Sequence, residues 1–161
     1  MRVHALRISR FQPGATQTPD SAWTSIGDVG QTFSEGVLTL AEYERVEALY
    51  LNAVSLLLED SEVRQLIVSD VQLTPLASET ARAIREGALV SASDALEICR
   101  LELRDEVSCR LEDDGRFYVH IGFDYYLYVG SKQVSAAAIE AIEQSGLFVE
   151  QGIPSPYTTA D

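Results

Sequence analysis

Apolar residues recur at helical spacing in one long segment of the chain. Thr39-Leu40-Ala41-Glu42 is a capping-box sequence, in which a threonine precedes a glutamate by three residues. The apolar positions that follow are three or four residues apart: Tyr43, Val46, Tyr50, Ala53 or Val54, and Leu57. This spacing predicts an amphipathic helix over about residues 40–59.

Other segments alternate apolar and polar residues or carry shorter helical patterns. Strands are predicted over residues 2–8, 64–73, 107–112, 116–121, 125–130 and 147–150. Helices are predicted over 94–105, capped by Ser91 or Ser93, and over 132–144, ended by Gly146. The stretch 76–90 is ambiguous, although residues 78–85 suit a short helix. Consecutive strands joined by tight turns indicate antiparallel pairing.

The chain is therefore predicted to be a single α+β domain spanning residues 1–161. Its sheet is expected to be largely antiparallel, with about 5–6 strands and two or three helices packed mainly on one face. Residues 9–38 are expected to form a long irregular loop, since prolines and glycines interrupt them repeatedly. Trp23 either pins this loop to the core or belongs to a binding site. Residues 151–161 are expected to form an extended, partly loose tail.

The segment 116–131 carries the most information about function. A three-residue turn formed by Gly122, Phe123 and Asp124 would pair residue 121 with 125, 119 with 127, and 117 with 129. Side chains alternate across a sheet, so one face of this hairpin would be apolar and would pack against the helices. The other face would present four aromatic side chains with an aspartate at the rim: Tyr118, His120, Tyr126, Tyr128 and Asp124.

In this register His120 is expected opposite Tyr126, and Tyr118 opposite Tyr128. Tyrosine is enriched at protein interfaces because it buries a large ring and keeps a hydrogen-bonding tip. The tyrosine–histidine face could therefore bind a partner. It could also be cross-strand aromatic pairing that stabilises the sheet, covered by the 9–38 loop.

Charge is the strongest signal in the composition. The chain has 25 acidic and 12 basic residues, a net charge of −13. Phosphate backbones repel such a protein, so nucleic-acid binding is not expected. A basic protein partner is expected instead, because complementary charge accelerates and selects association. The acidic group Glu112, Asp113 and Asp114 lies beside the hairpin and is expected to support this binding.

Signs of catalysis and of metal binding are few. His120 and Asp124 could form an imidazole oriented by a carboxylate, but the chain has only two histidines and no GxSxG, HExxH or phosphate-binding glycine loop. We expect no cofactor and no metal. Cys99 and Cys109 are expected to be reduced, mostly buried thiols. No apolar stretch is long enough to span a bilayer and no signal peptide is visible, so no membrane association and a cytoplasmic location are expected.

The segments 109–112 and 117–131 resemble those of small, largely uncharacterised bacterial proteins. The small, acidic, α+β character of the chain is similar to that of immunity proteins encoded beside bacterial polymorphic or contact-dependent toxins. This resemblance implies an inhibitor that neutralises a toxin domain by binding it, and it transfers no catalytic residue. Two other interpretations stay open. One is a small-molecule sensor or enzyme with Trp23, His120 and Tyr126 around a pocket between the 9–38 loop and the sheet, and the other is a homodimer that uses the tyrosine face.

Overall fold

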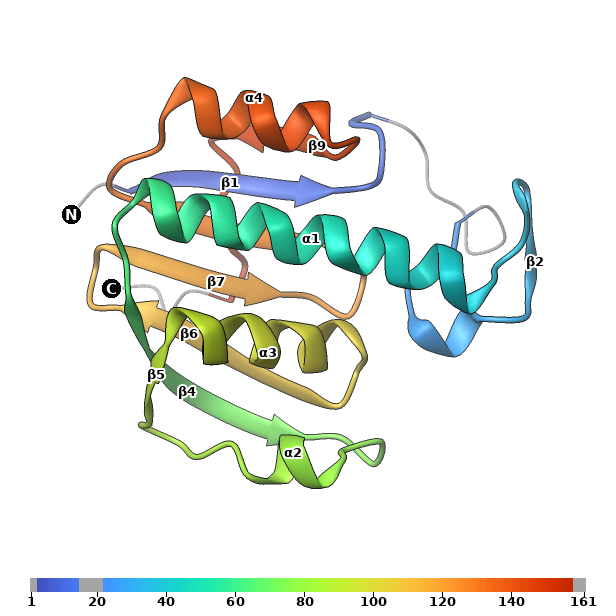
Figure 1. The fold of residues 1–161 in the computed structure, drawn as a ribbon, viewed down its shortest axis with the longest axis horizontal. Helices are drawn as coiled ribbons and strands as arrows, with labels where there is room; N and C mark the ends of the chain where they lie inside the picture. The colour runs from blue at the N-terminus through green and yellow to red at the C-terminus, as the bar shows by residue number, and fades with distance from the viewer. Residues whose placement is uncertain (1–2, 15–21, 158–161) are drawn as a thin grey trace.

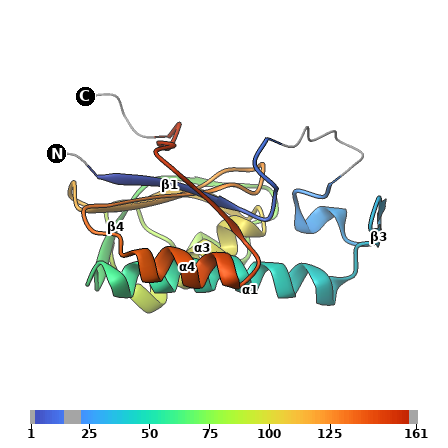
Figure 2. The same cartoon turned by 90° about the horizontal axis from the view of Figure 1, so that it is seen from above.

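The computed structural model describes residues 3–14 and 22–157. They form one seven-stranded antiparallel sheet with helices on one face, as the layers of Figures 1 and 2 show. The strand order is β5-β4-β6-β7-β8-β1-β9, so β5 and β9 are the two edges. The predicted α+β class is confirmed.

The elements occur at the following positions. The strands of the main sheet are β1 (His4–Ser9), β4 (Gln65–Leu73), β5 (Leu89–Ser91), β6 (Val107–Asp113), β7 (Phe117–Ile121), β8 (Leu127–Ser131) and β9 (Phe148–Gln151). A separate small ribbon pairs β2 (Thr32–Phe33) with β3 (Gly36–Val37). The helices are α1 (Leu40–Asp60), α2 (Glu79–Arg82), α3 (Ala92–Leu103) and α4 (Ala136–Gln144), with one 3-10 turn, η1 (Ile26–Asp28).

Serine and threonine side chains determine where the helices begin. Thr39 Oγ1 accepts a hydrogen bond from the Glu42 amide at 3.1 Å and caps α1, which starts at the predicted residue. The Glu42 carboxylate pairs with Arg45 and not with the Thr39 backbone, so only half of the predicted capping box is present. Ser91 caps α3, and Ser135 caps α4. Helix α4 starts at Ala136 and not at the predicted residue 132. The carboxylate of Asp60 in α1 accepts hydrogen bonds from the backbone amide and the hydroxyl of Ser135, and this keeps Ser135 at the N-cap, outside the helix.

The core lies between the sheet and helices α1, α3 and α4. Trp23 from the 9–38 segment packs into it, with ring centroids 5.5 Å from Tyr43 and 5.2 Å from Tyr125. The interpretation that Trp23 pins this segment to the core is thus confirmed. Part of the segment is regular, because it contains η1 and the β2–β3 ribbon; residues 15–21 lie outside the described part.

Three ionisable groups are buried together near α3 and β6. Cys99 and Cys109 are free thiols in the core, as predicted. Glu102 is also buried, and its Oε1 accepts a hydrogen bond from the Cys109 amide at 3.1 Å. Its Oε2 has no hydrogen-bond partner among the described residues. Desolvation raises the pKa of Glu102 to about 8, so burial favours the neutral acid.

The β7–β8 connection differs from the predicted three-residue turn. The structure pairs Ile121 with Leu127 and His120 with Tyr128, so residues 122–126 form a five-residue connection and β8 starts two residues later. Tyr125 adopts a positive φ of 66°, and its ring enters the core instead of continuing the strand. The predicted pairs are therefore wrong, but a shift of two residues leaves each side chain on its predicted face.

Candidate functional site

Strand pairing aligns one row of residues across the helix-free face of the sheet. Leu89 pairs with Ile67, Ile67 with Glu112, and Glu112 with Tyr118. The row continues from Tyr118 to Gly130 on β8 and then to Ala5 on β1. We call these six residues the cross-sheet row: Leu89, Ile67, Glu112, Tyr118, Gly130 and Ala5. It crosses six of the seven strands, and its two halves have different surroundings.

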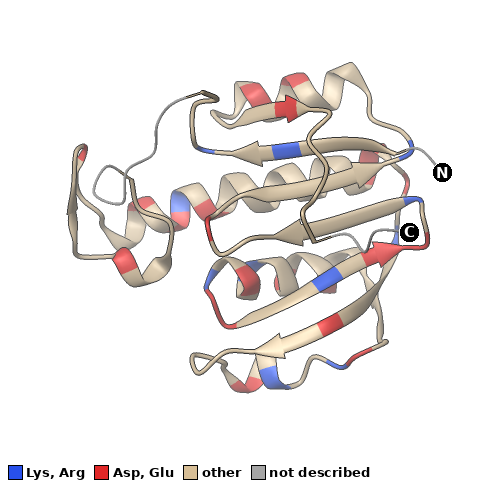
Figure 3. Cartoon of the chain, turned by 180° about the vertical axis from the view of Figure 1, so that it is seen from behind, with Lys and Arg blue, Asp and Glu red and all other residues tan. Residues whose placement is uncertain are grey.

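The half of the row on β7 and β8 is covered. The ring of Tyr118 lies over Gly130, since a Cβ added to that glycine would lie 2.0 Å from Tyr118 Cε1. The chain that follows β9 then crosses this face, as Figure 3 shows. Ser155 in this segment is only 4% exposed. We call residues 152–157 the C-terminal strap.

The strap contacts the predicted tyrosine–histidine face directly. Tyr157 packs edge-on against Tyr128 with ring centroids 6.1 Å apart. Its carbonyl accepts a hydrogen bond from Arg110 Nη1 at 3.3 Å. The 9–38 loop was one candidate cover for this face; of its described residues, Phe11 packs on Tyr126, whereas the strap packs on Tyr118, His120 and Tyr128. Residues 15–21 and 158–161 lie outside the described part. The predicted binding face is therefore largely covered by the strap.

His120 is the centre of the covered half. Its Nδ1 lies 2.7 Å from Ser155 Oγ and its Nε2 lies 2.9 Å from Glu112 Oε1. The Tyr118 ring is stacked on the imidazole at a centroid distance of 4.7 Å. Burial lowers the pKa of His120; Glu112 favours the charged ring and opposes this shift, while Arg110 acts with burial. The neutral ring then donates from Nε2 to the carboxylate, and the serine hydroxyl donates to Nδ1.

Ser155, His120 and Glu112 are the residue types of a hydrolase triad, but here their hydrogen bonds connect the strap to the sheet. A triad places its serine where a substrate can reach it. Here Ser155 Oγ is buried and also accepts a hydrogen bond from the Tyr157 amide at 3.1 Å. We therefore assign the set to holding the strap on the sheet. No group of three or more metal-ligating side chains occurs among the described residues.

The remaining predicted aromatic residue packs beside β1. Tyr126 is half-buried between Phe11, at a centroid distance of 5.3 Å, and the guanidinium of Arg7, at 4.7 Å. Arg7 is held in place by two hydrogen bonds to Glu150, at 2.7 and 2.9 Å. Tyr126 lies beside Tyr128, at a centroid distance of 6.5 Å, and not opposite His120 as predicted.

The structure divides the predicted acidic residues between the two ends of β7. Glu112 and Asp113 end β6, and Asp114 is exposed in the turn that follows. Asp124 is exposed in the connection beyond the other end of β7, where its Oδ1 accepts a hydrogen bond from the Tyr126 amide. Asp113 lies 3.5 Å from Arg116. The eight predicted partner-binding residues therefore do not form one exposed surface.

The uncovered half of the cross-sheet row lies in a cleft of about 330 Å³. Ile67 and Leu89 remain 45% and 61% exposed there. Nine residues line this cleft: Glu62, Val63, Arg64, Gln65, Ile67, Leu89, Glu112, Asp113 and Arg116. Ile67 falls in the predicted strand 64–73, but the sequence does not show its partner, because Leu89 falls in the stretch that had no clear assignment.

A pocket between the 9–38 segment and the sheet is not built as expected. The cleft beside this segment has a volume of about 130 Å³, and neither His120 nor Tyr126 is among its lining residues. Trp23 packs on the helix side of the sheet, whereas His120 faces the strap. The three residues expected to share a ligand are therefore on opposite sides of the sheet.

Comparisons with protein-family models, with curated proteins and with solved structures each found no significant match. None of the helices in the described ranges has the length and apolar character needed to cross a membrane.

Proposed function

We propose that this chain is an immunity-type inhibitor, which acts in the cytoplasm by binding and obstructing a basic toxin domain. The observation that supports this most strongly is the uncovered half of the cross-sheet row. It combines two exposed aliphatic side chains, Leu89 and Ile67, with the carboxylate of Glu112. Exposed apolar side chains rimmed by polar groups are typical of protein interaction sites.

Charge gives this surface a preference among partners. Three carboxylates (Glu62, Glu112 and Asp113) and two guanidinium groups (Arg64 and Arg116) line this cleft, and the chain as a whole carries a net charge of −13. Arg116 lies near Asp113, but Glu62 has no ion pair with a described residue. A partner that offers lysine or arginine beside an apolar patch would complement both properties. Obstruction of the partner's active site would neutralise it without any chemistry by this chain.

The product of the neighbouring gene is the appropriate first partner to test. We expect it to inhibit growth when expressed alone and to be neutralised by co-expression of this chain. Titration calorimetry on the purified pair should give tight binding that weakens as the salt concentration rises, because exposed charges are screened. Tight binding with no dependence on salt would contradict the electrostatic part of the proposal.

Two double variants separate this surface from apolar surface in general. Ile67→Ala with Leu89→Ala removes the anchors and should weaken binding at least about tenfold, which is roughly 1.4 kcal/mol. Val37→Ala with Leu40→Ala removes side chains of similar exposure, 59% and 50%, outside the cleft, and should leave affinity unchanged. Equal effects of the two double variants would contradict the assigned surface.

A further inference from the structure

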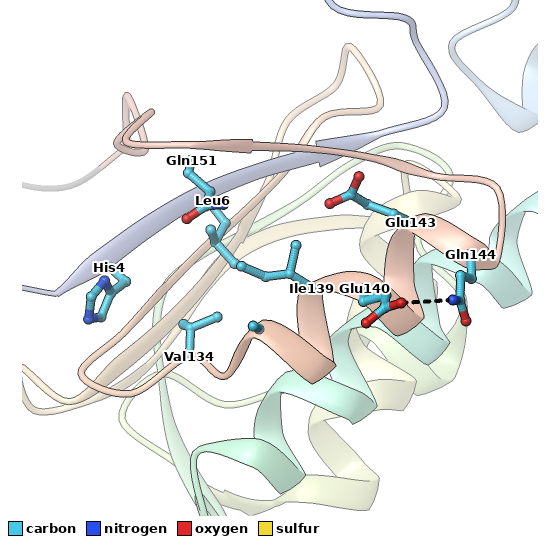
Figure 4. Close-up of a pocket in the computed structure, with 9 residues that line it drawn as sticks. His4, Leu6, Val134, Ile139, Glu140, Glu143, Gln144 and Gln151 are labelled. Carbon is cyan, nitrogen blue, oxygen red and sulfur yellow. Dashed lines mark hydrogen bonds between the residues drawn. The ribbon is translucent and has the colours of Figure 1, made fainter.

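A second groove lies at the other edge of the sheet, between α4 and the strands β1 and β9. It has a volume of about 660 Å³. Figure 4 shows its two walls, with side chains of α4 on one side and those of β1 and β9 on the other. Nine residues line it: His4, Leu6, Val134, Ala136, Ile139, Glu140, Glu143, Gln144 and Gln151. The groove lies beside β9, whereas the cleft of the cross-sheet row lies beside β5, at the opposite edge.

The floor of the groove is apolar. Leu6 of β1 and Ile139 of α4 point toward one another across it in Figure 4, and Val134 closes one end. Leu6 is almost fully buried by the surrounding protein, but Val134 and Ile139 are only half-buried. An aliphatic side chain of a bound segment would complete the burial of these two residues and would gain the transfer free energy of its own apolar surface.

The α4 wall of the groove carries negative charge. Glu140 and Glu143 are three residues apart, so they lie on the same side of the helix and both are exposed. Neither forms an ion pair with a described residue, and Glu140 only accepts a hydrogen bond from Gln144 Nε2 at 3.2 Å. No lysine or arginine is among the described residues that line the groove. The cleft beside β5 differs in this respect, because Arg64 and Arg116 line it.

We propose that this groove binds a short extended segment of a protein that carries arginine or lysine next to leucine-like side chains. The aliphatic side chains fit the floor, and the basic side chains reach Glu140 and Glu143. The volume suits a peptide of a few residues, since pockets of about 300–1,000 Å³ bury ligands of that size. A second copy of this chain suits the groove poorly, because its own charge of −13 repels the two glutamates.

This groove site is independent of the toxin-binding surface. The two sites occupy opposite edges of the sheet and share no lining residue. Substitutions at Glu140 and Glu143 should therefore leave binding of the neighbouring gene product unchanged, and the Ile67→Ala, Leu89→Ala variant should leave the groove unchanged. Failure of one site can thus be distinguished from failure of the other.

The test uses a synthetic blocked peptide of alternating leucine and arginine, with a leucine–glutamate peptide as its counterpart. Titration into the isotope-labelled full chain should shift the amide signals of Leu6, Val134 and Ile139 first, and the acidic peptide should shift none of them. Glu140→Gln with Glu143→Gln should weaken binding of the basic peptide about tenfold at low salt. Ile139→Asn should weaken it as well, because this substitution puts a polar group into the floor.

A matched control separates the groove from general attraction to an acidic protein. Glu35→Gln with Glu59→Gln removes the same charge from exposed positions outside the groove. This control should keep the affinity within about twofold of the unmodified chain. The proposal is overturned if both pairs weaken binding equally, if the signal shifts spread over the whole surface, or if light scattering shows that a second copy of the chain fills the groove.

Discussion

The two faces of the central sheet bury aromatic side chains in different ways. On the helix face, the hydroxyl of Tyr43 donates to the Leu103 carbonyl at 3.0 Å and that of Tyr50 donates to the Tyr125 carbonyl at 2.9 Å. These bonds join elements that are far apart in sequence. On the other face, the strap of residues 152–157 packs on Tyr118 and Tyr128, and the Tyr118 hydroxyl accepts a hydrogen bond from the Ser155 amide at 3.4 Å.

This difference suggests separate roles for the two layers: the helices stabilise the whole fold, and the strap covers part of one surface. Helices α1, α3 and α4 cover one face with residues from most of the chain. The strap covers the other with a single peptide segment, which forms hydrogen bonds to His120, Tyr118 and Arg110. Loss of a helix-face contact should therefore destabilise the whole domain, whereas loss of a strap contact should act mainly on the exposed face.

Two adjacent residues of β8 allow the strongest test of this difference between the two faces. Leu127 is fully buried on the helix face, and Tyr128 faces the strap. Leu127→Ala should lower the free energy of unfolding by about 2–5 kcal/mol, because it leaves a cavity in the core. Tyr128→Ala should cost clearly less, although the side chain is larger, because the strap can close over the space. Urea unfolding of both variants measures this, and equal costs would show that the strap holds its face as firmly as the helices hold theirs.

Glu102 gives the helix face a dependence on pH. The unfolded chain ionises this group near the ordinary pKa of 4.5, whereas the folded chain retains the proton to about pH 8. Between these values the unfolded state has released a proton that the folded state keeps. Glu102 therefore lowers stability progressively as the pH rises from 4.5 to 8.

Glu102→Gln should remove this dependence. The variant should be as stable as the unmodified chain near pH 4.5 and more stable at pH 8 by a few kcal/mol, at about 1.4 kcal/mol per pKa unit. Thermal unfolding across this pH range measures the difference. A stability difference that does not change with pH would show that Glu102 is ionised in the folded chain.

Gly130→Ala tests the contact between Tyr118 and Gly130 beneath the strap. The added Cβ would lie 2.0 Å from Tyr118 Cε1, so the ring must leave its position over the glycine and the strap must lose its contact with Tyr118. The expected cost is about 1–3 kcal/mol. Tyr118→Ala removes the clash, so the double variant should be less destabilised than the sum of the two single variants. Strict additivity would contradict the contact between Tyr118 and Gly130.

Ser155→Ala should have the smallest effect on stability. It removes the hydroxyl that bonds His120 Nδ1 and should cost about 0.5–1.5 kcal/mol. Amide exchange at Tyr157 should accelerate, because its amide also loses the Ser155 oxygen. Ser93→Ala, at an exposed position of α3, should change neither property. Unchanged exchange at Tyr157 in the Ser155 variant would show that other contacts hold the strap.

The helices and most strands could be predicted because their signals are local. Thr39 and Glu42 mark the start of α1, and apolar alternation assigns the faces of β7 and β8. The register of that hairpin could not be predicted, because the positive φ of Tyr125 depends on the core pocket that receives its ring. Strand β5 has only three residues, too few for an alternation pattern.

The binding surface was harder to predict because it depends on contacts between distant segments. Nothing near Ser155 in the sequence indicates that it meets His120, 35 residues away. That contact buries the histidine and removes it from the expected binding face. The predicted Glu112 and Tyr118 remain in the cross-sheet row, since direct strand pairing places them together.

The most direct test is hydrogen–deuterium exchange on this chain with and without the neighbouring gene product. If the partner docks on the uncovered half of the cross-sheet row, amides of residues 64–73 and 87–91 should exchange more slowly in the complex. The solvent-facing sides of α1 and α3 should be unchanged. Protection confined to the helix side of the molecule, with residues 87–91 exchanging as in the free chain, would contradict the proposed binding surface.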